Sequence, residues 1–153
     1  MKNSEWGIEL KYRVYLDNCC FNRPYDDQSY LATHLETEAK LFIQQEILKG
    51  GFELAWSYIL DFENSVNPYD ERKNSISKWR DVAVVDIDVS KEVVDRGNLI
   101  MQRGVNKKDA LHLACAIEAE CDYFLTTDKK LLNKAIPGII SINPLDFIRK
   151  LEV

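Results

Sequence analysis

The sequence predicts a three-layer α/β/α fold, in which a central, mainly parallel sheet carries helices on both faces. The first observation behind this prediction is that short apolar stretches of strand length alternate with longer stretches of helical spacing. A helix between two strands returns the chain to the end of the sheet where the first strand began, so strands joined through helices run parallel. The second is size: 153 residues, 46% of them hydrophobic, suffice for one core and are too few for two comfortable ones. We therefore expect a single domain over residues 1–153.

In the first half of the chain we expect a strand at 13–16, a loop at 22–27 and a helix at about 29–49. The apolar positions that recur at helical spacing in this helix are Leu31, Leu35, Ala39, Phe42, Ile43, Ile47 and Leu48. Gly50-Gly51 then ends the run as a C-terminal cap would. A short strand follows at 52–56, and Ser57 is placed to cap a helix that Pro68 closes.

The second half continues the alternation. A polar helix at about 70–79 leads into an apolar run at 82–87 of the kind that buried parallel strands show. Ser90 opens a helix that Gly104 ends, and the clearest helix spans about 107–119. A strand ending at Thr127, a short helix at 129–135, a strand at 138–142 and a final helix at 145–151 complete the expected fold.

Charge and hydropathy limit the partners and the location of the protein. A formal net charge of -5 gives no whole-molecule attraction for a polyanion, so nucleic-acid binding would require a local basic patch or bound cations. No stretch approaches the roughly 20 apolar residues of a spanning helix. The segment from Met1 to Trp6 is too polar and too acidic for a signal sequence, so we expect a cytoplasmic protein with no membrane association.

The four cysteines favour reduced thiols over disulfides. Cys19 and Cys20 are adjacent, while Cys115 and Cys121 fall in an apolar helix and at its exit, where a thiol packs as a small hydrophobe. The chain has no C-x-x-C pair, and its two histidines stand apart. The sequence therefore does not favour a zinc site.

Four carboxylates lie where strands give way to turns or where helices begin: Asp17, Glu63, Asp109 and Asp128. In open α/β sheets, ligands bind at the carboxyl ends of the strands. Carboxylates crowded at such an edge supply the oxygen ligands that hard cations require, and two such cations can activate a water for attack on a phosphodiester. Each acid also has a simpler interpretation, such as a helix cap at Asp128 or a first-turn charge at Asp109. Asp61 competes with Glu63, because the two point about 200° apart on a helix.

The residues around these acids resemble the successive motifs of PIN-domain ribonucleases, in the same order. The matching segments are 14–18 (VYLDN), 57–63 (SYILDFE), 108–114 (KDALHLA) and 126–128 (TTD). The resemblance implies that Asp17, Glu63, Asp109 and Asp128 hold Mg²⁺ or Mn²⁺, with Thr126 or Thr127 as the supporting hydroxyl. It further implies metal-dependent cleavage of RNA, often by the toxin of a toxin–antitoxin pair. An antitoxin partner and a homodimer are expectations of the same kind.

Two other functions compete with the nuclease interpretation. The segment after Asp17, NCCFNRP, differs from the small residue and apolar helix more typical of the toxins, which leaves open a catalytically silent domain that binds protein or RNA. A phosphatase of the haloacid-dehalogenase type also begins with a strand and an aspartate. That class requires a second aspartate two residues later, where this chain has Cys19.

Several further side chains are candidates near the acids. We expect Arg23, Lys107, Lys108 and Lys129 to be available for the RNA backbone, with Lys130 beside them. His112 follows Asp109 on the same helical face, and a packed, hydrogen-bonded histidine is favoured over a direct role in proton transfer. Trp56 is favoured as a core residue over a stacking platform for bases.

Overall fold

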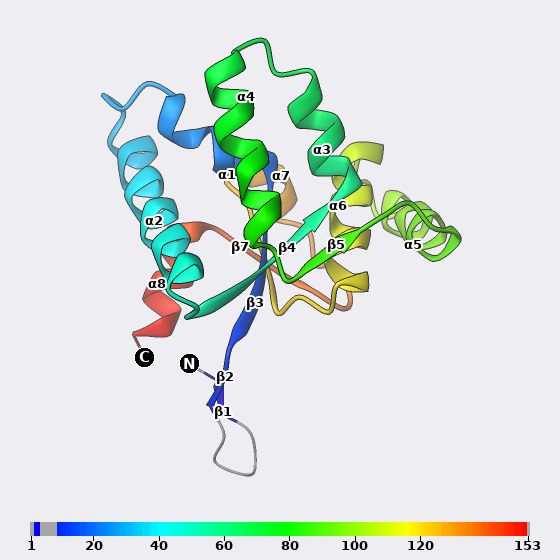
Figure 1. Ribbon diagram of the computed structural model, residues 1–153. Coiled ribbons are helices and arrows are strands. Elements are labelled where there is room, and N and C mark those ends of the chain that lie inside the picture. Colours follow the sequence, from blue (N-terminus) through cyan, green and yellow to red (C-terminus); the bar gives the residue numbers. More distant parts are fainter. Residues whose placement is uncertain (1, 4–8, 153) are drawn as a thin grey trace.

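A computed structural model describes residues 2–3 and 9–152 of the chain (Figure 1). The expectation for the segment from Met1 to Trp6 falls largely outside these residues. Within the described part of the chain, no helix is both long and apolar enough to cross a membrane.

The central sheet has five strands in the order β5-β4-β3-β6-β7, and every neighbouring pair is parallel. The strands are β3 (Tyr12–Leu16), β4 (Phe52–Ser57), β5 (Val85–Ile87), β6 (Tyr123–Leu125) and β7 (Ile140–Ile142). The first strand of this sheet is therefore also its centre, with β4 on one side and β6 on the other. A separate antiparallel pair, β1 (Lys2–Asn3) and β2 (Glu9–Leu10), projects away from the sheet, and the sequence did not predict it.

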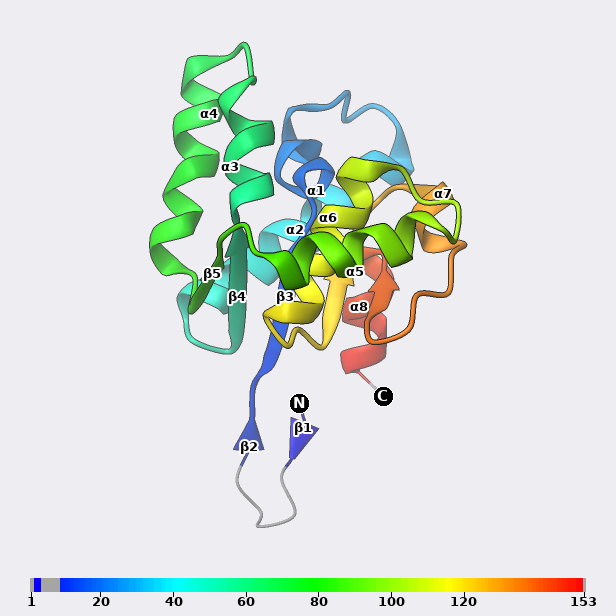
Figure 2. The same ribbon diagram turned by 90° about the vertical axis from the view of Figure 1, so that its right-hand side faces the viewer.

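Helices cover both faces of the sheet, which confirms the three-layer prediction. The helices are α1 (Asn18–Asn22), α2 (Leu31–Leu48), α3 (Tyr58–Ser65), α4 (Asp70–Ser77), α5 (Lys91–Met101), α6 (Lys107–Glu118), α7 (Lys129–Leu132) and α8 (Pro144–Leu151). Two 3₁₀ turns, η1 (Arg23–Tyr25) and η2 (Lys78–Val82), follow α1 and α4. Helices α2 and α8 lie on one face and α5 and α6 on the other, while α3 and α4 rise beyond the strand ends (Figures 1 and 2).

The expected helix boundaries follow from local chemistry. The hydroxyl oxygens of Ser57 and Ser90 accept hydrogen bonds from the backbone amides of Leu60 and Val93, which begins α3 and α5. Gly50 and Gly104 adopt φ of +84° and +88°, the left-handed region that favours glycine at a helix end. These caps confirm that α2, α3 and α5 are delimited by short local motifs.

Two expectations about local structure were wrong, those for the loop at 22–27 and for the buried strand at 82–87. The segment after Asp17 is helical over α1 and η1, where the sequence predicted a loop from residue 22. The helix expected at about 29–49 is confirmed as α2, in which Ala39, Ile43 and Ile47 are buried, whereas the other apolar positions of the predicted set are exposed, namely Leu31, Leu35, Phe42 and Leu48. Apolar residues are distributed around this helix, so their spacing cannot say which side packs on the sheet. The run at 82–87 supplies the edge strand β5, which is half-exposed, because no further strand covers it.

The core beneath the carboxyl ends of the strands is aromatic. Tyr15 stacks on Phe124 with ring centroids 5.4 Å apart, and Phe21 meets Trp56 edge-on at 5.5 Å. All four rings are buried, which confirms Trp56 as a core residue. The four cysteines are free thiols, and only Cys19 is partly exposed. The end of β3, next to Asp17, is therefore held in place by a tightly packed aromatic core.

Candidate metal centre

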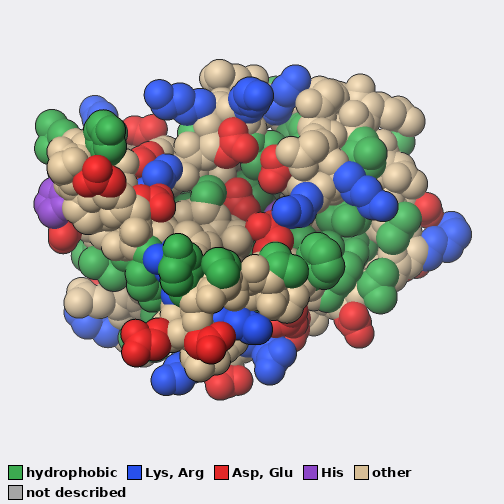
Figure 3. All heavy atoms as spheres, turned by 90° about the horizontal axis from the view of Figure 1, so that it is seen from above, with side chains coloured by type: hydrophobic (Ala, Val, Ile, Leu, Met, Phe, Trp, Pro, Cys, Tyr) green, Lys and Arg blue, Asp and Glu red, His purple; other side chains and the backbone are tan. Residues whose placement is uncertain are grey.

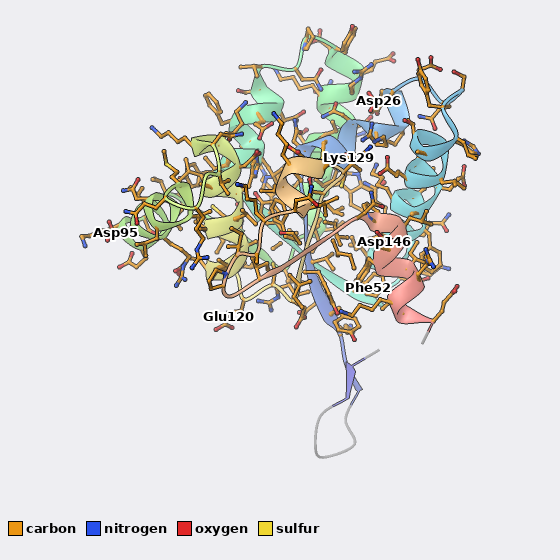
Figure 4. All side chains as sticks on the ribbon, turned by 180° about the vertical axis from the view of Figure 1, so that it is seen from behind. Asp26, Phe52, Asp95, Glu120, Lys129 and Asp146 are labelled. Carbon is orange, nitrogen blue, oxygen red and sulfur yellow. The ribbon has the colours of Figure 1, made fainter. Side chains whose placement is uncertain are left out.

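The four acids predicted from the sequence line one cleft at the carboxyl edge of the sheet. The cleft has a volume of about 500 Å³ and is lined by Asp17, Asn18, Cys19, Glu63, Asn106, Lys108, Asp109 and Asp128. In Figure 4, Lys129 marks this end of the molecule and Phe52, where β4 begins, marks the other. Looking down on the site end, Figure 3 shows acidic side chains gathered in a hollow with basic side chains around it.

Asp17 is the most deeply placed of the four acids, with only 6% of its surface exposed. It ends β3, the central strand, and its backbone amide donates to the carbonyl of Leu125 on β6 at 2.9 Å. Its carboxylate accepts hydrogen bonds from the amide of Asn18 at 2.7 Å and from the hydroxyl of Thr126 at 2.9 Å. Burial nevertheless raises the pKa of Asp17 well above its usual range, with a smaller contribution from the neighbouring Cys19. A bound cation would offset this desolvation of the charged form.

Thr126 connects the first and the fourth acid. Its hydroxyl donates to Asp17 and accepts from the backbone amide of Asp128 at 3.1 Å. Thr127 does not contact the acids in this way, and its amide instead donates to the sulfur of Cys19 at 3.4 Å. Of the two threonines considered from the sequence, Thr126 is the one placed to support the site.

Glu63 reaches the cleft from α3, whereas Asp61 points away from it. Asn18 Nδ2 donates to Glu63 Oε2 at 3.1 Å, and Glu63 Oε1 is hydrogen-bonded to His112 Nε2. Burial alone would raise the pKa of Glu63, but the hydrogen bonds with His112 and Asn18 and the charge of Lys108 outweigh it, and the pKa is lowered. Asp61 accepts from the indole of Trp56 at 3.0 Å and pairs with Arg80, so its carboxylate has a separate structural role.

Asp109 and Asp128 both lie in the first turn or at the cap of a helix and also face the cleft. Asn106 Nδ2 donates to Asp109 Oδ2 at 2.8 Å, and the amide of Asp109 donates to Asn106 Oδ1 at 2.9 Å, so the cap of α6 holds Asp109. Burial raises the pKa of Asp109, and the nearby Asp128 adds to this effect against the hydrogen bond from Asn106. Asp128 caps α7 through Oδ1, which accepts from the amides of Lys130 and Leu131. Capping and a place in the cleft are therefore compatible.

The basic residues proposed from the sequence divide into two groups. Lys108 lines the cleft, whereas Lys107 and Lys129 are exposed beside it. Arg23 is not brought to the cleft, because its guanidinium pairs with Asp26 at 3.0 Å and Glu36 at 3.4 Å, and α1 and η1 hold this segment in place. Its expected role in binding the RNA backbone is therefore not supported by its position.

Sequence reasoning missed three residues that line the cleft, Asn18, Cys19 and Asn106. Asn18 and Cys19 are the two residues that follow Asp17 in the chain, and Asn106 caps the helix that carries Asp109. The N-cap pattern before Asp109 was the available signal for Asn106. His112 is fully buried and hydrogen-bonded, as expected. One ring nitrogen of His112, one carboxylate oxygen of Asp17 and one of Glu63 all lie within 4.8 Å of one another, close enough to share a metal ion.

A protein-family profile described as the PIN domain matches residues 14–137, a span that includes all four acids. The chain belongs to the PIN-domain family. PIN domains are generally nucleases, and the arrangement of acids at the sheet edge agrees with that class. A comparison with curated proteins gave no match.

A solved structure shares the PIN fold of this chain. It is VapBC2 from Rickettsia felis, bound to a DNA fragment from their promoter. The two chains superpose with a TM-score of 0.53 and 19% sequence identity, over 86% of this chain and 98% of the other. At this identity the likeness concerns the fold alone.

Proposed function

We propose that this PIN domain is an endoribonuclease that hydrolyses RNA phosphodiester bonds with Mg²⁺ or Mn²⁺ held by Asp17, Glu63, Asp109 and Asp128. The observation that carries the proposal is the convergence of these four carboxylates, from four separate segments, on one cleft. Mutual repulsion and burial both disfavour four ionised carboxylates in one cleft, and a bound cation would offset this cost.

The residues of the cleft suit a hard divalent cation. All four acids offer oxygen atoms, and Asp17 combines deep burial with a carboxylate that burial makes harder to ionise. When bound, such an ion supplies an activated water and stabilises the charge on the phosphate oxygens.

The remaining residues of the cleft position its parts. Thr126 holds Asp17 and the start of the Asp128 segment, Asn18 orients Glu63, and Asn106 orients Asp109. Lys108 places a positive charge at the rim, where it attracts an RNA phosphate despite the net charge of -5.

The test is cleavage of single-stranded RNA by purified protein with Mn²⁺, with Mg²⁺ and with EDTA. Asp17→Asn and Asp128→Asn should abolish the metal-dependent activity. Asp95→Asn, an exposed aspartate of α5 that pairs with Lys91 away from the cleft, is the matched control and should cleave as the wild type does. If Asp17→Asn and Asp128→Asn cleave as well as Asp95→Asn, the assignment is wrong. The absence of both cleavage and metal binding in the wild type would favour the silent binding module.

The cellular setting belongs to the same proposal. We place residues 1–153 in a single nuclease domain that acts in the cytoplasm, as the toxin of a toxin–antitoxin pair, with an antitoxin protein and a second copy of the chain as partners. The motif resemblance and the fold shared with VapBC2 support this setting. A neighbouring reading frame for a small DNA-binding protein, whose product co-purifies with this chain, is the observation that tests it.

A further inference from the structure

A chain of buried hydrogen bonds runs from the start of α3 to the metal-site carboxylate Glu63. The hydroxyl of Tyr15 lies 2.6 Å from Ser57 Oγ and 2.6 Å from His112 Nδ1. The other ring nitrogen, His112 Nε2, contacts Glu63 Oε1. Ser57, Tyr15 and His112 are all fully buried, so water does not compete for these bonds.

With His112 neutral, the positions of the protons in this chain follow from the donors and acceptors. An ionised carboxylate can only accept, so its contact with His112 requires a proton on Nε2. In a neutral imidazole, Nδ1 is then an acceptor, and the hydroxyl of Tyr15 donates to it. Tyr15 has one proton, so its oxygen accepts from Ser57. Ser57 in turn accepts from the amide of Leu60 at 3.3 Å, which gives every group one consistent role.

We propose that His112 is neutral and that Ser57 and Tyr15 fix it as the tautomer protonated on Nε2, so that His112 donates to Glu63 and does not act as a metal ligand. Without this relay, the same Nε2 atom would be free to join Asp17 and Glu63 as a nitrogen ligand. The relay thus makes the centre an all-oxygen site, which suits Mg²⁺ and Mn²⁺ better than zinc.

The relay also orients Glu63. His112 donates to Oε1 while Asn18 donates to Oε2, so both oxygens of the carboxylate are held from the protein side. Outer-shell partners of this kind fix the orientation of a metal ligand, and their loss typically lowers metal affinity or activity about 10- to 100-fold. His112 and Tyr15 are positioning residues in this arrangement. The inference about metal affinity rests on the proposed function, whereas the tautomer does not.

The tautomer is measured by ¹⁵N NMR of the imidazole nitrogens in metal-free protein at neutral pH. The chain contains two histidines, and the second, His34, is exposed on α2, so a His34→Gln variant leaves the signals of His112 alone. The expected spectrum shows a protonated Nε2 and an unprotonated Nδ1. A protonated Nδ1, alone or together with Nε2, overturns the proposal.

The consequence for the metal is measured as the dissociation constant for Mn²⁺ by calorimetry. Tyr15→Phe keeps the buried ring and removes only the hydroxyl, and we expect it to weaken Mn²⁺ binding by about 10- to 100-fold. Tyr123→Phe is the control and should bind as the wild type does, because it removes a hydroxyl from a ring that packs against Tyr12 and Phe147 and does not line the cleft.

The outcomes separate the two proposals. Wild-type protein that binds no Mn²⁺ contradicts the proposed function, while the NMR spectrum still tests the relay. Wild-type and Tyr15→Phe proteins that bind Mn²⁺ within twofold of each other overturn the relay and leave the proposed function intact. Zinc gives a third readout: the preference for Mn²⁺ over Zn²⁺ should fall in Tyr15→Phe, and an unchanged preference counts against the relay.

Discussion

Replacement of Asp17 by Asn should uncouple the stability of the protein from divalent cations. The substitution keeps the size of the side chain and an oxygen that can accept the amide proton of Asn18, so the end of β3 should stay folded. It removes one negative charge from the deepest of the four acids. We therefore expect a folded protein that does not bind Mn²⁺ tightly.

The magnitude follows from binding to the folded state alone. A ligand at 100 times its dissociation constant stabilises the folded state by about 2.7 kcal/mol. For a protein of this length, 1 kcal/mol corresponds to roughly 2 to 4 °C in Tm. Mn²⁺ should therefore raise the Tm of the wild type by about 5 to 11 °C. In Asp17→Asn most of this rise should disappear.

Asp17 also makes the stability of the metal-free protein depend on pH. The pKa of Asp17 in the folded state is raised, chiefly by burial, so the folded state binds the proton more tightly than the unfolded state does. The contribution of Asp17 to stability is then fully present below its unfolded-state pKa and is lost as pH rises through the folded-state pKa. Metal-free Asp17→Asn lacks this loss, so its stability relative to the wild type should increase from acidic to neutral pH.

The assay is thermal unfolding followed by circular dichroism, with and without Mn²⁺ and across pH, with Asp95→Asn as the control. Asp95 is exposed on α5 and pairs with Lys91, so its loss should change neither the Mn²⁺ shift nor the pH dependence. A Mn²⁺ shift in Asp17→Asn equal to that of the wild type would contradict this prediction, because it would mean that the ion binds without this carboxylate.

Three further predictions concern the rim of the cleft. Cys19 is the only partly exposed cysteine, and hydrogen bonds from Cys20 and from the amide of Thr127 lower its pKa to about 5. Iodoacetamide should therefore label Cys19 first and block cleavage, while Cys19→Ser should resist inactivation; labelling elsewhere, seen by mass spectrometry, contradicts this. Asn106→Ala removes the cap of α6 and should lower the free energy of unfolding, measured by urea titration, by about 1 kcal/mol. Cleavage should also fall because Asp109 loses its hydrogen-bond partner, and an unchanged free energy with unchanged cleavage would exclude this role of Asn106. Lys108→Ala should weaken RNA binding and reduce the slope of log K against log salt concentration by about 0.7 for each lost phosphate contact. An unchanged slope would mean that the RNA does not contact Lys108.

The order of strands and helices was predictable because local patterns set it. Ser57, Ser90, Gly50 and Gly104 each delimit a helix through contacts within a few residues, and the alternation of strand and helix requires a parallel sheet. The buried face of α2 and the exposed position of β5 were not predictable, since both depend on which elements lie beside them in space.

The residues of the site likewise include some that local sequence patterns reveal and others that depend on contacts between distant segments. Asp17, Asp109 and Asp128 were identifiable because each lies beside a strand end or helix start. Glu63 lies near the end of α3, and only the motif resemblance connected it with the other three. The bond from Asn18 to Glu63 spans 45 positions and that from His112 to Glu63 spans 49, so neither has a local signature. For the same reason Arg23 looked available in the sequence, although in the folded chain it pairs with Glu36 on α2.

The central position of β3 determines when this site can exist during synthesis. Asp17 is made early, but the amide of Asp17 and its carboxylate find their partners Leu125 and Thr126 only after β6 has been made. Asp109 and Asp128 are also late in the chain, on either side of β6. A nascent chain that ends before β6 holds three of the four acids, but it lacks Asp128 and the strand beside Asp17. Under the proposed function, the chain would thus be unable to cut RNA for most of its own translation, without any inhibitor being present.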